Sequence, residues 1–530
     1  MRWSRFNSFR IMTENRRIFW NIVATYGRSL YGLMLGLFCG RWTLMALGQV
    51  DYGLNGLIGG LAVFIAFFNG ILASANARFY AFSVGAAKVA DDKDSAVEEC
   101  RHWFNTALSV HTVAPVLIIA IGYPVGVYAI EHWLTIPVDR IGACIWVFRF
   151  VCISCFVGMV NVPFSAMYGA KQYIAELTIY SFITSTFNVI ILYYMVTHPS
   201  DWLIKYAALT CVLSVLPQIV ICIRACYIFP ECRIKIAYMW DRSRLRRIGV
   251  FSLWQIIGSL CGMLRNQGMS IVVNKFFGPK MNAAQAVGNT VQGHCYSLAG
   301  SMQGAFVPVI TQSCGAGDYK RMNDFVIRLC KFNVLLSAIF VLPLALELPE
   351  VMRLWLKNPP AFAVGLCYCA MIHHLVNTCT TGHMVAINAT GRIAAYHVVL
   401  ASINIFTVPT AVLAGFCWRN VYVVMAVVVI FEAANSVGRL LFARAIAGTS
   451  LWKWIKGVFM PLFLVICICS ILGLFPRLIL GDSLIRVICT TIVCEIVLLP
   501  LSWFLVLNAE ERDFVSQKFM SLKNKFVNRK

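Results

Sequence analysis

Charged residues are scarce in this sequence, and acidic residues are the scarcest. Only 13% of the 530 residues are charged, with 23 Asp and Glu against 45 Lys and Arg, while 59% are hydrophobic and the mean hydropathy is +0.74. A soluble domain cannot cover its surface with so few charges. The composition therefore predicts an all-α integral membrane protein that crosses the bilayer many times.

Several signatures of built-in chemistry are missing as well. The sequence has no Gly-Lys dipeptide, which excludes a Walker A phosphate loop, and no His-Glu-x-x-His zinc motif. Its 21 cysteines are scattered singly rather than arranged as a disulfide framework, and we interpret the pair Cys152 and Cys155 as small packing residues. The first apolar stretch is not preceded by a signal-peptide cleavage pattern, so we expect it to stay in the mature protein. These absences predict no cofactor, no metal site and no enzymatic activity.

Long apolar stretches recur along the whole chain, each able to cross ~30 Å of hydrocarbon as a helix. The loops between them are too short to fold as soluble catalytic domains. We expect about fourteen membrane-spanning helices, at residues 19–47, 53–87, 103–130, 141–166, 173–196, 203–227, 248–274, 283–313, 325–346, 361–389, 393–416, 421–446, 457–475 and 484–507.

Basic residues gather in alternate loops, whereas the other loops, such as 48–53, carry almost none. Because cytoplasmic loops are enriched in Lys and Arg, this pattern predicts that both termini are cytoplasmic. The basic groups are Arg2, Arg5, Arg10, Arg16 and Arg17; Lys88, Lys93 and Arg101; Arg233, Lys235, Arg242, Arg244, Arg246 and Arg247; Arg439, Arg444, Lys453 and Lys456; and Arg512, Lys518, Lys523, Lys525, Arg529 and Lys530.

The sequence contains an internal repeat that appears when it is shifted by 230 residues. Gly48 then falls on Gly278 and Gly85 on Gly315, and each repeat holds six expected spans. Both repeats begin on the same side of the membrane, so we expect two parallel six-helix lobes related by a pseudo-twofold along the membrane normal. The expected divisions are an N-lobe at 1–240, a C-lobe at 241–447 and an accessory helix pair with a basic tail at 448–530.

Isolated arginines lie inside the expected spans, where a charge costs at least ~2.5–3.5 kcal/mol. Arg28, Arg78 and Arg265 have small residues one helical turn away, which indicates a face that packs on helices or lines a cavity. We predict that these three bind substrate; an interhelical ion pair or capping of a carbonyl is the alternative. Arg41 and Arg149 lie near the outer ends of their spans, where they either join the same cationic cavity or reach the interface.

Two acidic residues, Glu176 and Glu432, also lie inside expected spans. We interpret each as half of an ion pair with a nearby cation, with coupling to an ion as the alternative. His294 is interpreted as a polar packing residue. A cavity with several arginines and few acids suits an anion, above all a diphosphate, which guanidinium groups bind bidentately.

Short motifs give the chain a resemblance to a known family. The sequence resembles the O-antigen and polysaccharide flippases of the multidrug/oligosaccharidyl-lipid/polysaccharide (MOP) exporter superfamily over most of residues 15–450. The motifs are GRWTLMALGQVDYGLNGLIGG (40–60), SANARFYAFSVG (74–85), FGPKMNAAQAV (277–287), GAGDYKRM (315–322) and NATGRIAAYHVV (388–399).

This resemblance implies a MATE-like fold with two lobes around a cationic cavity that opens alternately to either side. It also implies that the substrate is an oligosaccharide on undecaprenyl diphosphate, flipped across a bacterial inner membrane. Arg28, Arg41 and Arg78 match arginines of the family in position. Gly48, Gly278 and Pro308 are the predicted hinge or gating residues. Other polysaccharide-assembly proteins are expected as partners, and nucleic acid is not.

Three other functions remain open from the sequence alone. A drug antiporter of the same superfamily would share the fold but needs acidic rather than basic cavity residues. A membrane-bound glycosyl- or acyltransferase would need a cluster of acid and base groups at one face, and the loop acids Asp91, Asp92, Asp94, Glu98 and Glu99 form a solvated patch instead. A scaffold for polysaccharide assembly would not depend on its buried arginines.

Overall fold

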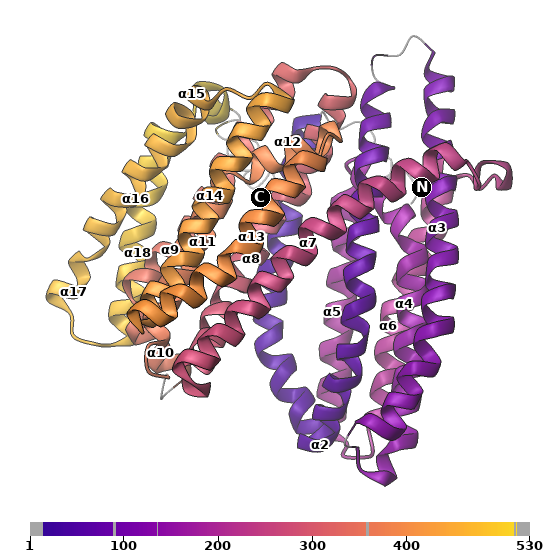
Figure 1. Cartoon of the computed structure of the whole chain (residues 1–530), viewed down its shortest axis with the longest axis horizontal. Coiled ribbons are helices and arrows are strands. Elements are labelled where there is room, and N and C mark those ends of the chain that lie inside the picture. Colours follow the sequence, from indigo (N-terminus) through magenta and orange to yellow (C-terminus); the bar gives the residue numbers. More distant parts are fainter. Residues whose placement is uncertain are drawn as a thin grey trace, which may run out of the picture. The chain divides into compact units, whose positions relative to one another are not determined.

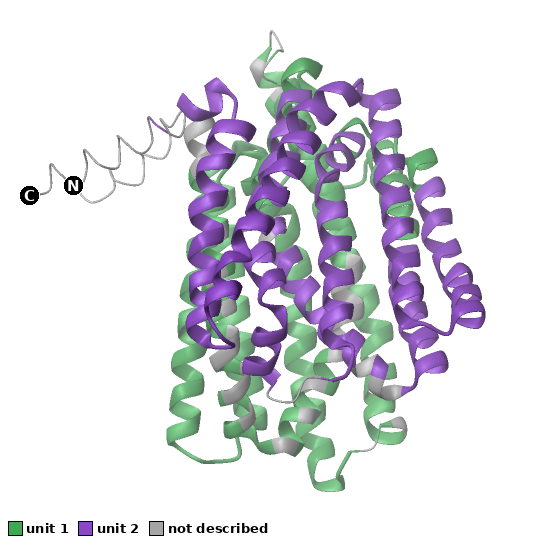
Figure 2. Ribbon diagram, turned by 90° about the vertical axis from the view of Figure 1, so that its left-hand side faces the viewer, with its two compact units in different colours: residues 1–259, 301–322, 388–397 green, residues 260–300, 323–387, 398–530 purple. Residues whose placement is uncertain are grey.

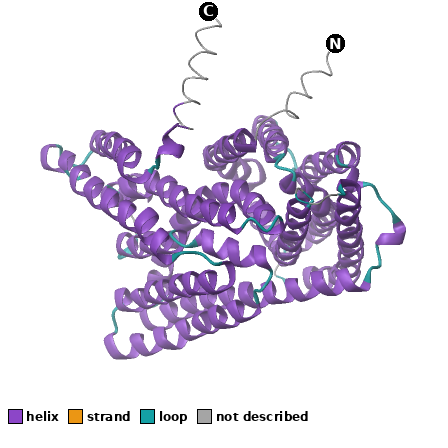
Figure 3. Ribbon diagram, turned by 90° about the horizontal axis from the view of Figure 1, so that it is seen from above, coloured by secondary structure: helices purple, strands orange, loops and turns teal. Residues whose placement is uncertain are grey.

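The computed structural model describes residues 14–87, 89, 92–134, 136–356, 360–513 and 516. These residues form helices joined by short turns, with no strand among them (Figure 3). The helices labelled in Figure 1 are α2 (Glu14–Ala86), α3 (Lys93–Tyr128), α4 (Ile141–Ala170), α5 (Ile174–Thr197), α6 (Leu203–Ile228), α7 (Arg242–Phe277), α8 (Pro279–Gly315), α9 (Tyr319–Leu346), α10 (Leu348–Leu356), α11 (Ala363–Thr378), α12 (Thr381–Thr390), α13 (Ala394–Trp418), α14 (Val421–Ala447), α15 (Leu451–Trp454), α16 (Met460–Gly473), α17 (Phe475–Ile479) and α18 (Leu484–Leu501).

The expected spans all coincide with helices, and the all-α membrane fold is confirmed. Among the described residues, ten helices are long and apolar enough to cross a membrane. The expected spans 19–47 and 53–87 fall on α2, 283–313 falls on α8, and 361–389 falls on α11 and α12, none of which is among those ten. The count of fourteen spans therefore stays a prediction.

The chain forms two compact units, which Figure 2 shows in different colours. Unit 1 comprises residues 1–259, 301–322 and 388–397, and unit 2 comprises 260–300, 323–387 and 398–530. Each unit is assembled from segments that are distant in the sequence. The expected boundaries at residues 240 and 447 remain predictions about the lobes.

In unit 1, α2 packs on α4 and α5, and α4 packs on α3 and α6. One of its apolar clusters includes Leu54, Ile58 and Val147, which are all buried. At Gly126 on α3, an added methyl group would collide with the ring of Phe148 on α4. Such close contact is what holds helices together in lipid, where the surroundings are as apolar as the helices themselves.

Helix α2 is interrupted at Gly48, where the backbone adopts φ 75° and ψ 172°. This conformation is essentially restricted to glycine, because a Cβ atom clashes with the neighbouring peptide groups. Gly278, the repeat-related residue, also has a positive φ of 80° and separates α7 from α8. The two predicted hinge glycines thus share a backbone feature that ends one helical segment and begins the next.

The ends of α2 and α8 meet in unit 1 through a pair of repeat-related glycines. A methyl group on Gly85 would collide with the carbonyl of Gln312, and one on Gly315 would collide with the carbonyl of Phe82. Phe82 and Gln312 are themselves 230 residues apart. The contact is therefore reciprocal, as in an interface across a twofold axis, and it makes the internal repeat visible as backbone packing.

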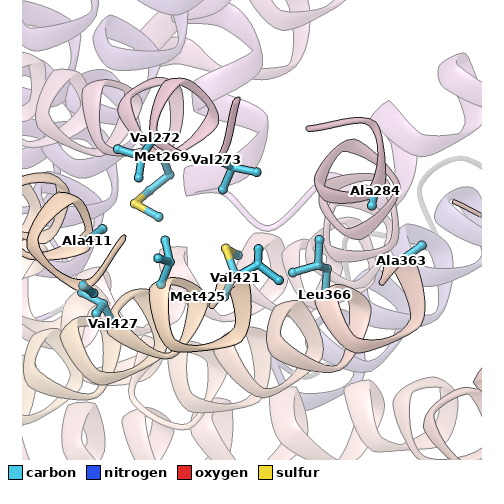
Figure 4. Packing of buried hydrophobic residues seen from close by; sticks show 12 residues of the cluster. Met269, Val272, Val273, Ala284, Ala363, Leu366, Ala411, Val421, Met425 and Val427 are labelled. Atoms are coloured by element: carbon cyan, nitrogen blue, oxygen red, sulfur yellow. The ribbon is translucent and has the colours of Figure 1, made fainter. Parts of the chain in front are cut away.

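In unit 2, helices α7, α8, α11, α13 and α14 share an apolar core. Figure 4 shows Met269, Val273, Leu366 and Met425 gathered in it. A second core joins α9 and α14 to the last helices, through buried residues such as Val334, Leu462 and Leu498. This second core attaches the accessory helices α15–α18 to the rest of unit 2.

Buried ion pairs lie at both ends of this attachment. Glu347, which is fully buried, lies 2.9 Å from Arg486 and accepts a hydrogen bond from Thr490. Lys331 lies 2.7 Å from Glu511, and both side chains are at most 5% exposed. The accessory helices are thus held by complementary charges as well as by apolar packing.

All 21 cysteines lie among the described residues, and none forms a disulfide. Twenty are buried or half-buried, whereas Cys417 at the end of α13 is exposed.

Candidate functional site

A buried carboxylate in unit 2 organises a cluster of polar side chains. Glu432 on α14 is 2% exposed and accepts a 2.6 Å hydrogen bond from Asn377 on α11. Its Oε2 lies 3.1 Å from Arg265 Nη1 and 3.4 Å from His373 Nε2, and its Oε1 lies 3.2 Å from Arg439 Nη2. One carboxylate is thus shared by two guanidinium groups.

The sequence positions of these residues explain why they converge. Glu432 and Arg439 are seven residues apart on α14, and His373 and Asn377 are four apart on α11, so each pair lies on one face of its helix. Helix α14 begins where Asn420 accepts a 2.9 Å hydrogen bond from the Tyr422 amide. The helix continues to Ala447 and contains both Glu432 and Arg439.

A second set of polar side chains fixes the cluster. Arg265 Nη1 donates to Asn404 Oδ1 at 3.0 Å, and Asn435 donates to the same oxygen at 3.1 Å. Gln292 Nε2 donates to His373 Nδ1 at 2.7 Å. Because Nδ1 accepts this bond, a neutral His373 carries its proton on Nε2, the atom that faces Glu432.

Arg439 also stabilises a break between two helices. Helices α11 and α12 are separated at Cys379 and Thr380, and Arg439 Nη1 lies 3.4 Å from the carbonyl oxygen of Asn377. Carbonyl groups that are freed where two helical segments meet at membrane depth need such partners. Discontinuous helices with polar surroundings are also where many transporters bind their substrates.

A cavity of about 420 Å³ lies next to this cluster, within unit 2. Clefts that bind small molecules are typically ~300–1,000 Å³. Its lining combines polar and apolar side chains and, among the described residues, contains no carboxylate. The lining residues are Arg265, Asn266, Met269, Gln285, Gly288, Asn289, Gln292, Gly293, Tyr296, Leu366, Cys369, Ala370, His373, Met425, Val428 and Val429.

Arg78, in unit 1, is held by backbone and aromatic contacts. Its Nε donates a 2.9 Å hydrogen bond to the carbonyl oxygen of Asn388, near the end of α12. Its guanidinium carbon lies 4.8 Å from the centroid of the Phe79 ring and 5.1 Å from that of Phe251. A methyl group on Gly391 would collide with this guanidinium. These contacts match the carbonyl-capping alternative, because a cation is favoured at a helix C-terminus; substrate binding by Arg78 stays a prediction.

The other predicted arginines have different environments. Arg28 is exposed on α2, and the side chain of Arg41 lies outside the described part of the chain. Arg149 is exposed, donates a 2.9 Å hydrogen bond to Tyr123 and lies 4.6 Å from the Trp146 ring. The contacts of Arg149 are those expected of an interfacial arginine. Arg265 joins the buried cluster in unit 2 and also lines the cavity.

The remaining predicted residues are placed as follows. Glu176 forms an ion pair with Arg224, so both intramembrane acids of the prediction, Glu176 and Glu432, have arginine partners. Pro308 is buried in α8, which continues through it, and His294 is exposed on the same helix.

Sequence reasoning missed several residues that the structure brings together. Arg439 was assigned to the basic residues of a loop, which is wrong, because it lies inside α14 and is 9% exposed. Glu432 lies seven residues before Arg439 on the same helix face, and this spacing could have indicated that the two side chains pair inside the helix bundle. In unit 1, a buried chain links Asn76 Nδ2 to His111 Nε2 at 2.8 Å and His111 Nδ1 to the Met159 carbonyl at 2.9 Å, and the sequence had not suggested it.

Comparison with known proteins shows the fold. No protein-family model matches the sequence, and no curated protein matches it either. The chain is similar to a multidrug resistance MATE family transporter of the MOP superfamily in an outward-facing conformation, at 14% identity over 84% of this chain and 96% of that one, with a TM-score of 0.63. A Vibrio cholerae MATE transporter in the bent form gives 14% identity, 82% and 97% coverage, and a TM-score of 0.62.

A MOP superfamily transporter from Pyrococcus furiosus is similar at 14% identity over 82% of this chain and 96% of that one, with a TM-score of 0.64. The TM-scores of these matches establish a shared fold, and at 14% identity they establish the fold alone. The MATE-like part of the prediction is therefore confirmed, and the finer resemblance to polysaccharide flippases is not established by these similarities.

Proposed function

We propose that this protein is a MOP-type transporter that flips an oligosaccharide linked to a polyprenyl diphosphate across a bacterial inner membrane. In this proposal both termini are cytoplasmic, the two repeats give alternating access, and the protein performs no chemistry on its cargo. Other polysaccharide-assembly proteins are its proposed partners. The shared fold supports transport as the class of function, and the motifs of the sequence support the class of cargo.

The observation that carries the proposal is the polarity of the cavity in unit 2. Its described lining contains Arg265, His373 and four carboxamide side chains but no carboxylate. The nearby carboxylate of Glu432 is already occupied by Arg265 and Arg439. Taking a bare organic cation into such a site would leave its charge without a counter-ion, which is costly in a low-dielectric interior. An anionic, hydroxyl-rich cargo has matching partners there.

A cation or drug antiporter with the same fold is the second candidate. The Pyrococcus furiosus transporter is described as having a binding pocket of reverse polarity that suggests a different function for that protein. The polarity of the cavity described here supports an anionic rather than a cationic cargo. Efflux of a cationic dye from cells that express the protein tests this candidate directly, and we expect none above background.

Reconstitution tests the proposal itself. Purified protein is placed in vesicles that carry a labelled polyprenyl-diphosphate oligosaccharide, and the appearance of label in the opposite leaflet is measured. We expect flipping by the parental protein and a loss of at least tenfold, or ~1.4 kcal/mol in activation free energy, for Arg28→Ala. Arg28 is exposed on α2, within the expected span 19–47, where a diphosphate can reach it.

Lys205→Ala is the matched control, because Lys205 is also a cation, lies against Trp202 near a helix end and hydrogen-bonds Ser200. We expect this variant to flip at the parental rate. Flipping at the parental rate by Arg28→Ala would remove this arginine from the mechanism. Absence of flipping by the parental protein, together with dye export, would replace the proposal by the antiporter.

A further inference from the structure

The cavity in unit 2 has one polar wall and one apolar wall. Gln285, Asn289, Gln292 and Tyr296 lie on α8 at intervals of four, three and four residues, so they form one stripe along the helix. The other helices supply the apolar wall and also the polar residues Arg265, Asn266 and His373. The apolar wall contains Met269 from α7, Leu366 from α11, and Met425, Val428 and Val429 from α14.

Three buried polar atoms on this lining have no hydrogen-bond partner among the described residues. One is His373 Nε2, which faces Glu432 Oε2 at 3.4 Å. The other two are Gln285 Oε1, on a residue that is 4% exposed, and Arg265 Nε, on a side chain that is 11% exposed. A buried polar atom without a partner costs ~1–3 kcal/mol. Gln285 and Arg265 both line the cavity, so a ligand there can supply an acceptor for Arg265 and a donor for Gln285.

The charge of the site selects the sign of the ligand. Arg265 and His373 line the cavity, whereas Glu432 divides its two oxygens between Arg265 and Arg439. The positive charge of Arg265 is therefore only partly neutralised on the cavity side. A carboxylate or phosphate on the ligand gains from this charge, and a cation does not.

The two walls together select the remaining chemistry. A carboxamide both donates and accepts hydrogen bonds, as a sugar hydroxyl does, so a stripe of them suits a ring with several hydroxyl groups. The C–H faces of the same ring can pack on the methionine and valine side chains. We propose that this cavity binds an acidic sugar, with its anionic group at Arg265 and its hydroxyl groups along Gln285, Asn289 and Gln292.

This inference rests on the proposed function in one respect, since it assigns the acidic sugar to the cargo. Binding itself does not require transport and is measured on the purified full-length protein. The probes are glucuronate, glucose and choline, followed by calorimetry. We expect glucuronate to bind at least tenfold more tightly than glucose, a difference of ~1.4 kcal/mol, and choline not to bind.

Substitutions on α8 locate the site. A methyl group on Gly293 would meet no atom within 4 Å, so a side chain can start there without a clash, and Gly293→Leu adds bulk to the cavity lining. We expect it to weaken glucuronate binding at least tenfold, and Gln285→Leu to weaken it several-fold. Gly300→Leu is the matched control, because Gly300 also has free space around it on α8 and does not line the cavity. Its thermal unfolding and its glucuronate affinity should equal those of the parental protein.

Three results would overturn the inference: equal affinity for glucuronate and glucose, binding of choline, or unchanged glucuronate binding by Gly293→Leu. Competition identifies the source of the sugar. A lipid-linked oligosaccharide that ends in glucuronate should displace the free sugar, and one that ends in glucose should not. If neither lipid-linked oligosaccharide displaces glucuronate, the cavity does not bind the transported cargo.

The two proposals can fail independently. Glucuronate binding without flipping in vesicles would retain the site and contradict the transported cargo. Flipping at the parental rate by Gly293→Leu, with no glucuronate bound by either protein, would retain the flippase and contradict the site.

Discussion

The buried charges around Arg265 and Arg439 in unit 2 depend on one carboxylate. Glu432 contacts Arg265, Arg439 and His373, and each of these side chains is at most 11% exposed. Removing one member of a buried ion pair is far more harmful than replacing the whole pair by apolar residues, because it leaves a charge without a partner. The stability of the cluster is therefore concentrated in a single side chain.

We expect Glu432→Gln to lower the free energy of unfolding by about 3–5 kcal/mol, measured as a lower midpoint of thermal unfolding in detergent. Glu176→Gln is the control, since it makes the same chemical change. Glu176 and Arg224 are 17% and 32% exposed, so this pair is less buried than the Glu432 cluster and its loss should lower the unfolding midpoint less. Equal effects of the two substitutions would contradict a special role for Glu432.

At the scale of helices, glycines decide where backbones can approach or turn. The reciprocal contact of Gly85 with Gln312 and of Gly315 with Phe82 leaves no room for a side chain. A larger residue at either position must separate the ends of α2 and α8. Overpacking of this kind typically costs ~1–3 kcal/mol.

We therefore expect Gly85→Ala and Gly315→Ala each to lower the thermal unfolding midpoint. Gly304→Ala on α8 is the control, because a methyl group there would meet no atom within 4 Å. It should leave the midpoint unchanged or raise it, since alanine favours a helix by up to ~1 kcal/mol over glycine. A stabilising effect of Gly85→Ala would show that the helix ends do not meet.

The break in α2 gives a separate prediction. Gly48 adopts φ 75° and ψ 172°, a conformation that costs other residues ~1–3 kcal/mol. Gly48→Ala should destabilise the protein by about that amount in thermal unfolding. Gly32→Ala should not, because Gly32 lies within the helical part of α2 and has free space around it.

The sequence predicted the helices well because each apolar run is as long as a membrane-spanning helix. The repeat also aligned Gly48 with Gly278, and the structure shows a positive φ at both residues, whereas their role as hinges stays a prediction. The sequence could not predict the partners of Arg265, because Glu432 is 167 residues away and is brought near only by packing of α7 on α14. The sequence did not predict the break between α11 and α12 for the same reason. Arg439, whose guanidinium lies next to the break, is on α14 and is distant in the sequence.

At the scale of the whole molecule, the accessory helices are part of unit 2 rather than an addition to it. Glu347 and Lys331 lie on or next to α9 and find their partners Arg486 and Glu511 in the last part of the chain. In lipid, uncovering an apolar helix face costs little, but leaving a charge without its partner is costly. The charges should therefore decide whether the chain tolerates loss of these helices.

A chain that ends at Ala447 should fail to accumulate in the membrane. The same truncation with Glu347→Gln and Lys331→Met should accumulate to a larger extent, because no uncompensated charge remains at either position. Quantitative immunoblotting of membranes measures both. Equal loss of the two truncated proteins would show that apolar packing, rather than the ion pairs, makes the accessory helices necessary.

The exposed cysteine Cys417 can be used to determine the orientation of the chain in the membrane. Cys417 is exposed at the end of α13, whereas the other cysteines are buried or half-buried. The predicted orientation places this turn on the outer face of the membrane. A maleimide that cannot cross the bilayer should therefore label intact spheroplasts at Cys417, and Cys417→Ser should abolish most of the signal. Labelling that appears only after lysis would show that the orientation of the whole chain is opposite to the predicted one. The experiment needs no engineered cysteine.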